Sequence, residues 1–324
     1  MPRQARLDAP GTLHHVMIRG MERKRIVEDD ADRLQFVRRL GKLAVETGTT
    51  IYAWALMTNH AHILLSSGPL GLAKFMRRFL TGYAVSYNLR HRRHGHLFQN
   101  RYKSIVCDGD SYFTELVRYI HLNPLRVNLV PNLSELERYA YCGHGVILGT
   151  VKQQWQDRDS VLSQFGSREG EAKSAYRRFV AEGVALGRRP ELVGGGLIRS
   201  LGGWSEVKSP RRRGKRELAD ERILGNGDFV ERVIRDAEAR MQRPYSARER
   251  GRRVERLIVE ACKKSKVSVT ELRSGSRRGA IPVVRAELSR KLVEDFGIPI
   301  AEIARHVGVS TSAISKSLAR TYST

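Results

Sequence analysis

Short apolar runs and helical repeats alternate along the N-terminal part of the chain. Runs rich in β-branched and aromatic residues predict four strands, at Leu13–Arg19, Thr50–Met57, Ala61–Leu65 and Leu97–Cys107. Apolar residues at helical spacing predict three helices, at Asp29–Glu46, Pro69–Leu89 and Asp110–His121. The order β-α-β-β-α-β, followed by a helix, is typical of an α+β fold in which a ferredoxin-like split βαβ antiparallel sheet carries helices on one face.

The pattern weakens after Tyr139 and becomes helical again from Asp228. Between these positions, a glycine-rich stretch at 187–204 and an Arg/Lys run at 205–220 predict a solvated connector or a phosphate-contacting loop. Helical spacing then predicts helices at Val254–Ala261, Ala286–Phe296, Ile300–Val307 and Ser312–Arg320. We therefore expect an α+β domain over 1–145, a helical and Gly/Arg-rich connector over 146–227, and an all-α domain over 228–324.

The net charge of the chain indicates what kind of partner it binds. The 324 residues include 58 Lys and Arg against 34 Asp and Glu, a formal net charge of +24, which points to a polyanion such as nucleic acid. No apolar run is long enough for a membrane span and the first residues lack a signal peptide, so we expect a cytoplasmic, nucleoid-associated protein without a membrane partner. The 3 cysteines form no CxxC pair, which argues against a zinc ribbon.

Histidines concentrate in the first half, and two of them carry the first candidate chemistry. His60 and His62 lie in Asn59–Leu65 (NHAHILL) on a predicted strand, where alternate side chains share a face. Two adjacent imidazoles can bind one divalent cation. The pattern equally fits one exposed histidine beside a hydrogen-bonded one.

The helix that ends in Asn123-Pro124 carries the second candidate group. Glu115, Tyr119 and Asn123 are four residues apart and so stack on one helix face. A tyrosine can attack an electrophile that a cation has polarised, and an asparagine oxygen can bind a hard metal ion. The alternative is a core tyrosine with a hydrogen-bonded hydroxyl and an Asn-Pro pair that only ends the helix.

Three ordered motifs, NHAHILL, GHLFQNRYKS and YIHLNPLRVNLV, give a resemblance over Leu13–Val130. This stretch resembles the single-tyrosine HUH transposases, in particular the REP-associated tyrosine transposases. The resemblance implies that His60, His62 and Asn123 hold Mg²⁺ or Mn²⁺ and that Tyr119 is the nucleophile. It further implies cleavage and rejoining of single-stranded DNA near hairpins through a 5′-phosphotyrosine bond. Relatives include dimers and monomers, so both states stay open.

Basic side chains near these motifs are expected to follow the DNA backbone, with Arg101, Lys103 and Arg126 as the nearest candidates. Tyr102, next to Lys103, is the alternative nucleophile, but a packing or base-stacking role is favoured for it.

The last predicted helices have the layout of a helix-turn-helix, with Gly308 at the turn. The second helix would present hydroxyls and a cation to duplex DNA, from Ser310, Thr311, Ser312, Ser315 and Lys316. The segment from Phe229 to Arg320 is similar to the duplex-binding domain of the bacterial replication initiator, although 309–313 (VSTSA) departs from that family's signature. A plain helical hairpin is the alternative.

Two other functions remain open at this point. A DNA-binding regulator on a domesticated transposase fold would keep the fold with little or no cleavage. An RNA-binding protein would use exposed aromatic side chains on the sheet. Only Tyr52 and Trp54 share a strand face there, and the aromatic-rich signature of that fold is missing.

Overall fold

The computed structural model describes residues 7–99, 102–187, 189–193, 220–241 and 247–322. Contacts divide the chain into two units, one of residues 1–75 and 98–241 and the other of residues 76–97 and 242–324. Among the described residues, no helix has the length and apolar character that a membrane crossing requires. The three segments predicted from the sequence, with boundaries at 145 and 227, stay a prediction.

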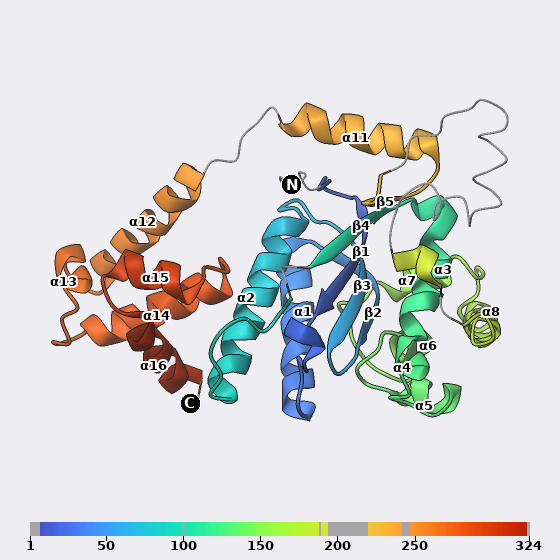
Figure 1. The fold of residues 1–324 in the computed structure, drawn as a ribbon, viewed down its shortest axis with the longest axis horizontal. Helices are drawn as coiled ribbons and strands as arrows, with labels where there is room; N and C mark the ends of the chain where they lie inside the picture. Colours follow the sequence, from blue (N-terminus) through green and yellow to red (C-terminus); the bar gives the residue numbers. More distant parts are fainter. Residues whose placement is uncertain (1–6, 100–101, 188, 194–219, 242–246, 323–324) are drawn as a thin grey trace. The chain divides into compact units, whose positions relative to one another are not determined.

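A mixed sheet forms the centre of the first unit (Figure 1), and its order is β2-β3-β1-β4-β5. The strands are β1 (Leu13–Arg19), β2 (Thr50–Leu56), β3 (His60–Ser66), β4 (Lys103–Cys107) and β5 (Ile223–Leu224). The first four pair antiparallel in the order of a split βαβ sheet, which confirms the predicted α+β class. Strand β4 is shorter than predicted, and β5, which the sequence did not predict, pairs parallel to it.

Helices α1 (Asp30–Thr47) and α3 (Gly109–His121) lie on opposite sides of this sheet (Figure 1), and not on one face as the sequence pattern predicted. Asp29 caps α1 by accepting a hydrogen bond from the Asp32 amide. Helix α3 begins at Gly109, one residue before the predicted start at Asp110. Its apolar face packs on β2, β3 and β4 through Leu116, Val117 and Ile120. The packing holds Tyr119, which lies between Val117 and Ile120 in the sequence, beside the sheet.

The chain after α3 adds short helices to the same core. They are α4 (Asn123–Arg126), α5 (Leu133–Arg138), α6 (His144–Leu148), α7 (Arg158–Leu162), α8 (Glu169–Glu182) and the 3₁₀ turn η2 (Pro190–Val193); an earlier one, η1, spans Met21–Arg23. Ile147, Val161, Tyr176 and Leu192 are buried with α3. Much of the predicted connector therefore belongs to the core, while its Gly/Arg-rich part at 194–219 lies outside the described residues. After β5, α11 spans Gly227–Met241.

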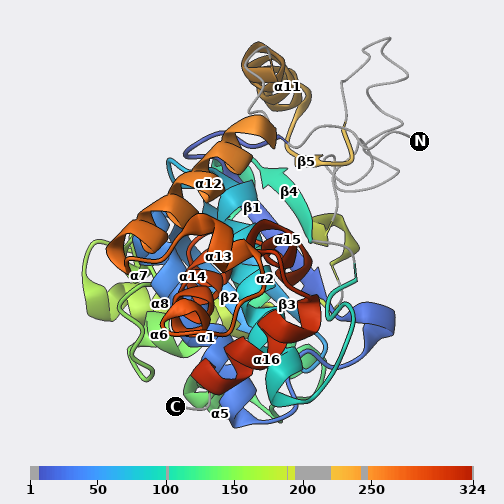
Figure 2. The same cartoon turned by 90° about the vertical axis from the view of Figure 1, so that its left-hand side faces the viewer.

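The second unit is helical. It comprises α2 (Leu72–Arg90) from Met76 on, α12 (Ala247–Lys264), α13 (Val269–Arg273), α14 (Ile281–Glu294), α15 (Ile300–Val307) and α16 (Thr311–Tyr322). Figure 2 shows α12 to α16 grouped together. Val85 of α2 is buried in the same core as Leu292, Ile303 and Leu318. This unit therefore includes a helix from the N-terminal half of the sequence.

Candidate active site

Strand pairing brings three histidines onto the face of the sheet that α3 covers. In the antiparallel register, His60 lies opposite Arg19, His62 opposite Met17, and Leu64 opposite His15. The rings of His60 and His62 are 5.4 Å apart between centroids, as expected for alternate positions on one strand. His62 is only 6% exposed, whereas His60 is half-buried.

His62 is hydrogen-bonded to His15, which is itself completely buried. His15 Nε2 and His62 Nδ1 are 2.9 Å apart, and His15 Nδ1 lies 3.0 Å from the carbonyl oxygen of Leu192 in η2. Burial lowers the pKa of His15 to about 4 against the opposing effect of the Leu192 carbonyl. Burial, together with His15, His60 and Arg19, also holds the pKa of His62 well below its ordinary value. Both imidazoles are therefore neutral near pH 7.

His60 is held in a comparable way by its neighbour Asn59. The Asn59 amide nitrogen donates to the Arg23 carbonyl at 3.0 Å, and its Oδ1 lies 2.6 Å from His60 Nδ1. Burial, with help from Arg19, lowers the pKa of His60 to about 4. The Nδ1 atoms of both His60 and His62 are thus engaged, and within the described part of the chain neither Nε2 has a hydrogen bond.

Tyr119 of α3 lies against these histidines. Its ring centroid is 5.8 Å from that of His62 and 5.9 Å from that of His15, both edge-on. Burial raises the pKa of the Tyr119 phenol and Glu191 adds to the rise, whereas Arg126 and Arg19 oppose it. The predicted nucleophile and the predicted histidine pair therefore share one site.

Arg126 of α4 also contacts Tyr119. Its guanidinium carbon lies 5.3 Å from the centre of the Tyr119 ring, and its nitrogens donate to the carbonyls of Tyr119 and Gly183 at 3.4 Å each. The side chain is half-buried. A cation in this position stabilises a phenolate more than a phenol.

Asn123, the predicted third metal ligand, is buried just after α3, as the first residue of α4. Its Nδ2 donates to the carbonyls of Tyr119 at 3.0 Å and Ile120 at 3.4 Å, so the side chain also closes the helix end. Its Oδ1 carries no hydrogen bond among the described residues. Asn123 likewise has no hydrogen bond to His60 or His62 there.

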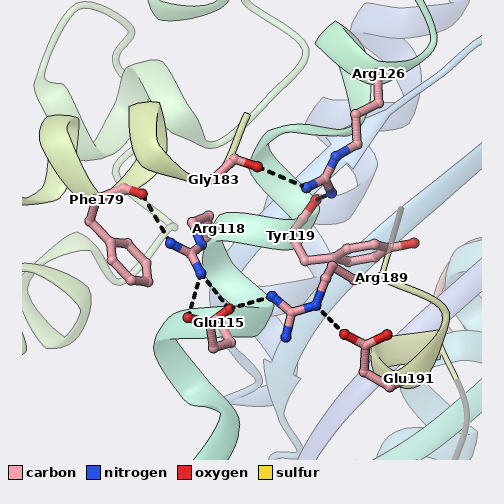
Figure 3. Close-up of polar contacts among 8 residues, drawn as sticks. All are labelled: Glu115, Arg118, Tyr119, Arg126, Phe179, Gly183, Arg189 and Glu191. Carbon is pink, nitrogen blue, oxygen red and sulfur yellow. Dashed lines mark hydrogen bonds and ion pairs between the residues drawn. The ribbon is translucent and has the colours of Figure 1, made fainter. Parts of the chain in front are cut away.

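Ion pairs join α3 to the segment around η2 (Figure 3). Glu115 accepts two hydrogen bonds from Arg118, at 2.6 and 2.7 Å, and a third from Arg189 at 3.2 Å. Arg118 also donates to the Phe179 carbonyl and stacks on that ring at 4.0 Å. Arg189 in turn pairs with Glu191. Glu115, predicted to share a face with Tyr119, is here a structural anchor of the tyrosine helix.

The side chains present fit a divalent ion. A ligating imidazole nitrogen lies about 2.1 Å from the metal, so two rings on one ion have centroids about 5 Å apart, close to the 5.4 Å between His60 and His62. In the described ranges, no group of three or more His, Cys, Asp or Glu side chains is placed to hold a metal. Further ligands must come from another type of group, such as the Asn123 amide.

The remaining predicted contact residues lie in different places. Lys103 is exposed, and its ammonium donates to the Val193 carbonyl at 2.7 Å. Arg101 lies outside the described residues. In the second unit, α15 and α16 are joined by 308–310; Ser310, Thr311, Ser312 and Lys316 are exposed, and Ser315 is partly exposed. Gly308 makes this turn with φ +69°, and a side chain there would collide with the Arg273 carbonyl.

Sequence reasoning missed His15, Asn59 and the segment 189–193. Asn59 is part of the NHAHILL motif, but its role could not be predicted because its hydrogen bond depends on where the fold places the Arg23 carbonyl. His15 and Leu192 are 177 residues apart, and nothing in the local pattern connects them. The only available signal was the His14-His15 pair on a predicted strand, because alternation places one of the two on the same face as His62.

Comparison with known proteins bears on this site. Residues 11–123, or 113 of the 324, match the family model described as IS200-like transposase. This part of the chain, which includes His15, His60, His62, Tyr119 and Asn123, is similar to that family. A solved structure of a REP-associated tyrosine transposase bound to a REP hairpin is similar at 13% identity with a TM-score of 0.38, over 49% of this chain and 98% of that one. Comparison with curated proteins gave no match.

Proposed function

We propose that this protein is a metal-dependent single-stranded DNA endonuclease and strand transferase that acts at or near hairpin-forming sites. The observation that carries the proposal is the position of Tyr119 beside His62, with ring centroids 5.8 Å apart, within a segment similar to IS200-like transposases. A nucleophile and two neutral metal ligands in one site suit phosphoryl transfer.

In this proposal His60, His62 and Asn123 hold Mg²⁺ or Mn²⁺. The ion supplies charge neutralisation on the oxygens of the scissile phosphate. His60 and His62 are held as neutral bases by burial, and α3 holds the Tyr119 ring edge-on to the ring of His62. Arg126, against the Tyr119 ring, favours the phenolate that attacks phosphorus.

The reaction conserves the phosphodiester energy. A bond forms between Tyr119 Oη and phosphorus, the bond from phosphorus to the 3′ oxygen breaks, and that oxygen takes up a proton to become a 3′-hydroxyl. The phenol proton leaves to water. The product is a 5′-phosphotyrosine, which a second 3′-hydroxyl reverses without ATP, so one site both cuts and rejoins DNA.

DNA contacts belong to the proposal as well. Lys103 and Arg126 follow the single strand near the site, and Arg101, outside the described residues, is proposed as a further backbone contact. Ser310, Thr311, Ser312, Ser315 and Lys316, around the start of α16, contact duplex DNA through a helix-turn-helix formed by α15 and α16.

The test uses the full chain with labelled hairpins flanked by randomised single strands, in Mg²⁺ or Mn²⁺. We expect a denaturant-resistant protein–DNA adduct that Tyr119→Phe and His62→Ala abolish. Tyr112→Phe, on the same helix and packed against the same core, is the matched control and keeps the adduct. Tyr102→Phe tests the alternative nucleophile. Binding without any Tyr119-dependent adduct would overturn the enzymatic proposal in favour of the DNA-binding regulator.

A further inference from the structure

His15 forms the middle of a buried hydrogen-bond chain that ends on a ligand of the proposed site. Its Nδ1 faces the Leu192 carbonyl at 3.0 Å, and its Nε2 faces His62 Nδ1 at 2.9 Å. His15 is 0% exposed and Leu192 is 1% exposed. Neither partner can be exchanged for water without opening this core.

The direction of each hydrogen bond follows from the carbonyl end. A carbonyl oxygen only accepts, so the proton of the neutral His15 ring is on Nδ1. His15 Nε2 then carries a lone pair and accepts from His62, whose proton must be on Nδ1. The lone pair of His62 is left on Nε2, which has no hydrogen bond among the described residues.

We propose that His15 is a positioning residue that fixes His62 in the Nδ1–H tautomer and thereby presents the Nε2 lone pair of His62 to the metal ion. This inference rests on the proposed function, which makes His62 a metal ligand. Histidine ligands commonly donate their second ring N–H to an acceptor that sets tautomer and ring orientation. The acceptor here is another imidazole, itself oriented by a backbone carbonyl.

Other roles for His15 conflict with its contacts. It is not a metal ligand, because both ring nitrogens are engaged by protein groups. For the same reason it is not the base that takes the Tyr119 proton, although its ring centroid is 5.9 Å from that of Tyr119. Its hydrogen bonds instead connect η2 to His62. The Leu192 side chain is buried in the main core, and the Leu192 carbonyl orients the His15 ring.

The matched control lies one residue away on the same strand. His14 is as buried as His15, yet both of its ring nitrogens lack a hydrogen bond among the described residues. Replacing either histidine by phenylalanine removes a buried imidazole from β1, but only His15→Phe removes the acceptor of His62. A general effect on the stability of β1 should therefore appear in both variants, whereas an effect on the His62 tautomer should appear only in His15→Phe.

The experiment reads the tautomer of His62 directly in metal-free full-length protein by long-range ¹H–¹⁵N correlation, with His62→Gln to assign the signal. We expect Nδ1–H in the parent and His14→Phe, and loss of that tautomer in His15→Phe. His15→Gln, whose amide has one donor and one acceptor side, is expected to retain the tautomer, and His15→Leu, which has no acceptor and should lose it, serves where the phenylalanine variant does not fold. An Nε2–H tautomer in the parent, or Nδ1–H retained in folded His15→Phe, would overturn the proposal.

Manganese binding supplies the second readout. Titration of the same proteins with Mn²⁺, followed by electron paramagnetic resonance, should show a 10- to 100-fold weaker affinity in His15→Phe, with His14→Phe and His15→Gln close to the parent. Equal weakening in His14→Phe and His15→Phe would contradict a positioning role. If the parent binds no Mn²⁺ at His62 while the tautomer result holds, the proposed function fails, but the role of His15 in fixing the tautomer of His62 remains supported.

Discussion

Tyr119 illustrates how single residues set the reactivity of this site. Its phenol is half-buried, which disfavours the phenolate and raises the pKa, and Arg126 is the first group to oppose that rise. Arg126 is itself tied to two carbonyls, so its charge stays against the ring. The residue predicted to contact DNA thus already has a structural partner inside the site.

Replacing Arg126 by glutamine should slow the chemical step as well as weaken binding. Without the cation the Tyr119 pKa rises further, and one additional unit lowers the phenolate fraction about tenfold below that pKa. Single-turnover adduct formation at saturating DNA measures the step apart from affinity. Arg138→Gln, which removes an exposed charge from α5, is the control. A weaker Kd with an unchanged single-turnover rate would limit Arg126 to DNA binding.

At the scale of elements, a polar network around Glu115 adds to the apolar contacts that attach α3 to α8 and η2. Glu115 is 28% exposed and receives three hydrogen bonds from Arg118 and Arg189, while Arg118 is only 9% exposed. Removing a carboxylate that satisfies a nearly buried guanidinium leaves that charge uncompensated.

We therefore expect Glu115→Gln to lower the free energy of unfolding by about 2 kcal/mol. The paired control is Glu135→Gln, which breaks an exposed i,i+3 pair with Arg138 and should cost less than about 0.5 kcal/mol. Urea unfolding of both variants measures the difference. Equal effects would show that the network around Glu115 does not anchor α3.

Elements with their own periodicity were predictable and elements that depend on distant partners were not. The bounds of β1 and α15 agree with the sequence pattern, because alternation and helical spacing there coincide with burial. Strand β5 has only two residues and forms by pairing with β4, which lies more than 100 residues earlier in the sequence. The histidine pair and the tyrosine were predicted because motifs place them locally; His15 was missed because its partners come from β3 and η2.

At the scale of the whole molecule, sequence order and packing diverge. Residues 76–97 pack with the C-terminal helices, and the helices between 144 and 182 complete the core of the sheet unit. The net charge of +24 is therefore carried by two units that are each built from distant parts of the sequence. Both units include predicted DNA contacts.

Buried histidines in the sheet unit should also make the whole fold sensitive to acid. Three of them lie outside the proposed metal ligands and His15: His14, His121 and His144. Burial lowers the pKa of His14 and His144 to about 4, and that of His121 well below its ordinary value, with His144 adding to the effect on His121. His121 and His144 share the Tyr176 hydroxyl at 2.7 and 2.8 Å.

In the unfolded chain these histidines titrate near pH 6.5. Between pH 6.5 and 4 the unfolded state therefore binds protons that the folded state excludes, so stability falls as the pH falls, by up to about 1.4 kcal/mol per pH unit for each group. Urea unfolding at pH 7.5, 6.5 and 5.5 should show this loss. His14→Phe should reduce the slope by one proton. A flat profile over this range, or an unchanged slope in His14→Phe, would contradict neutral burial of these side chains.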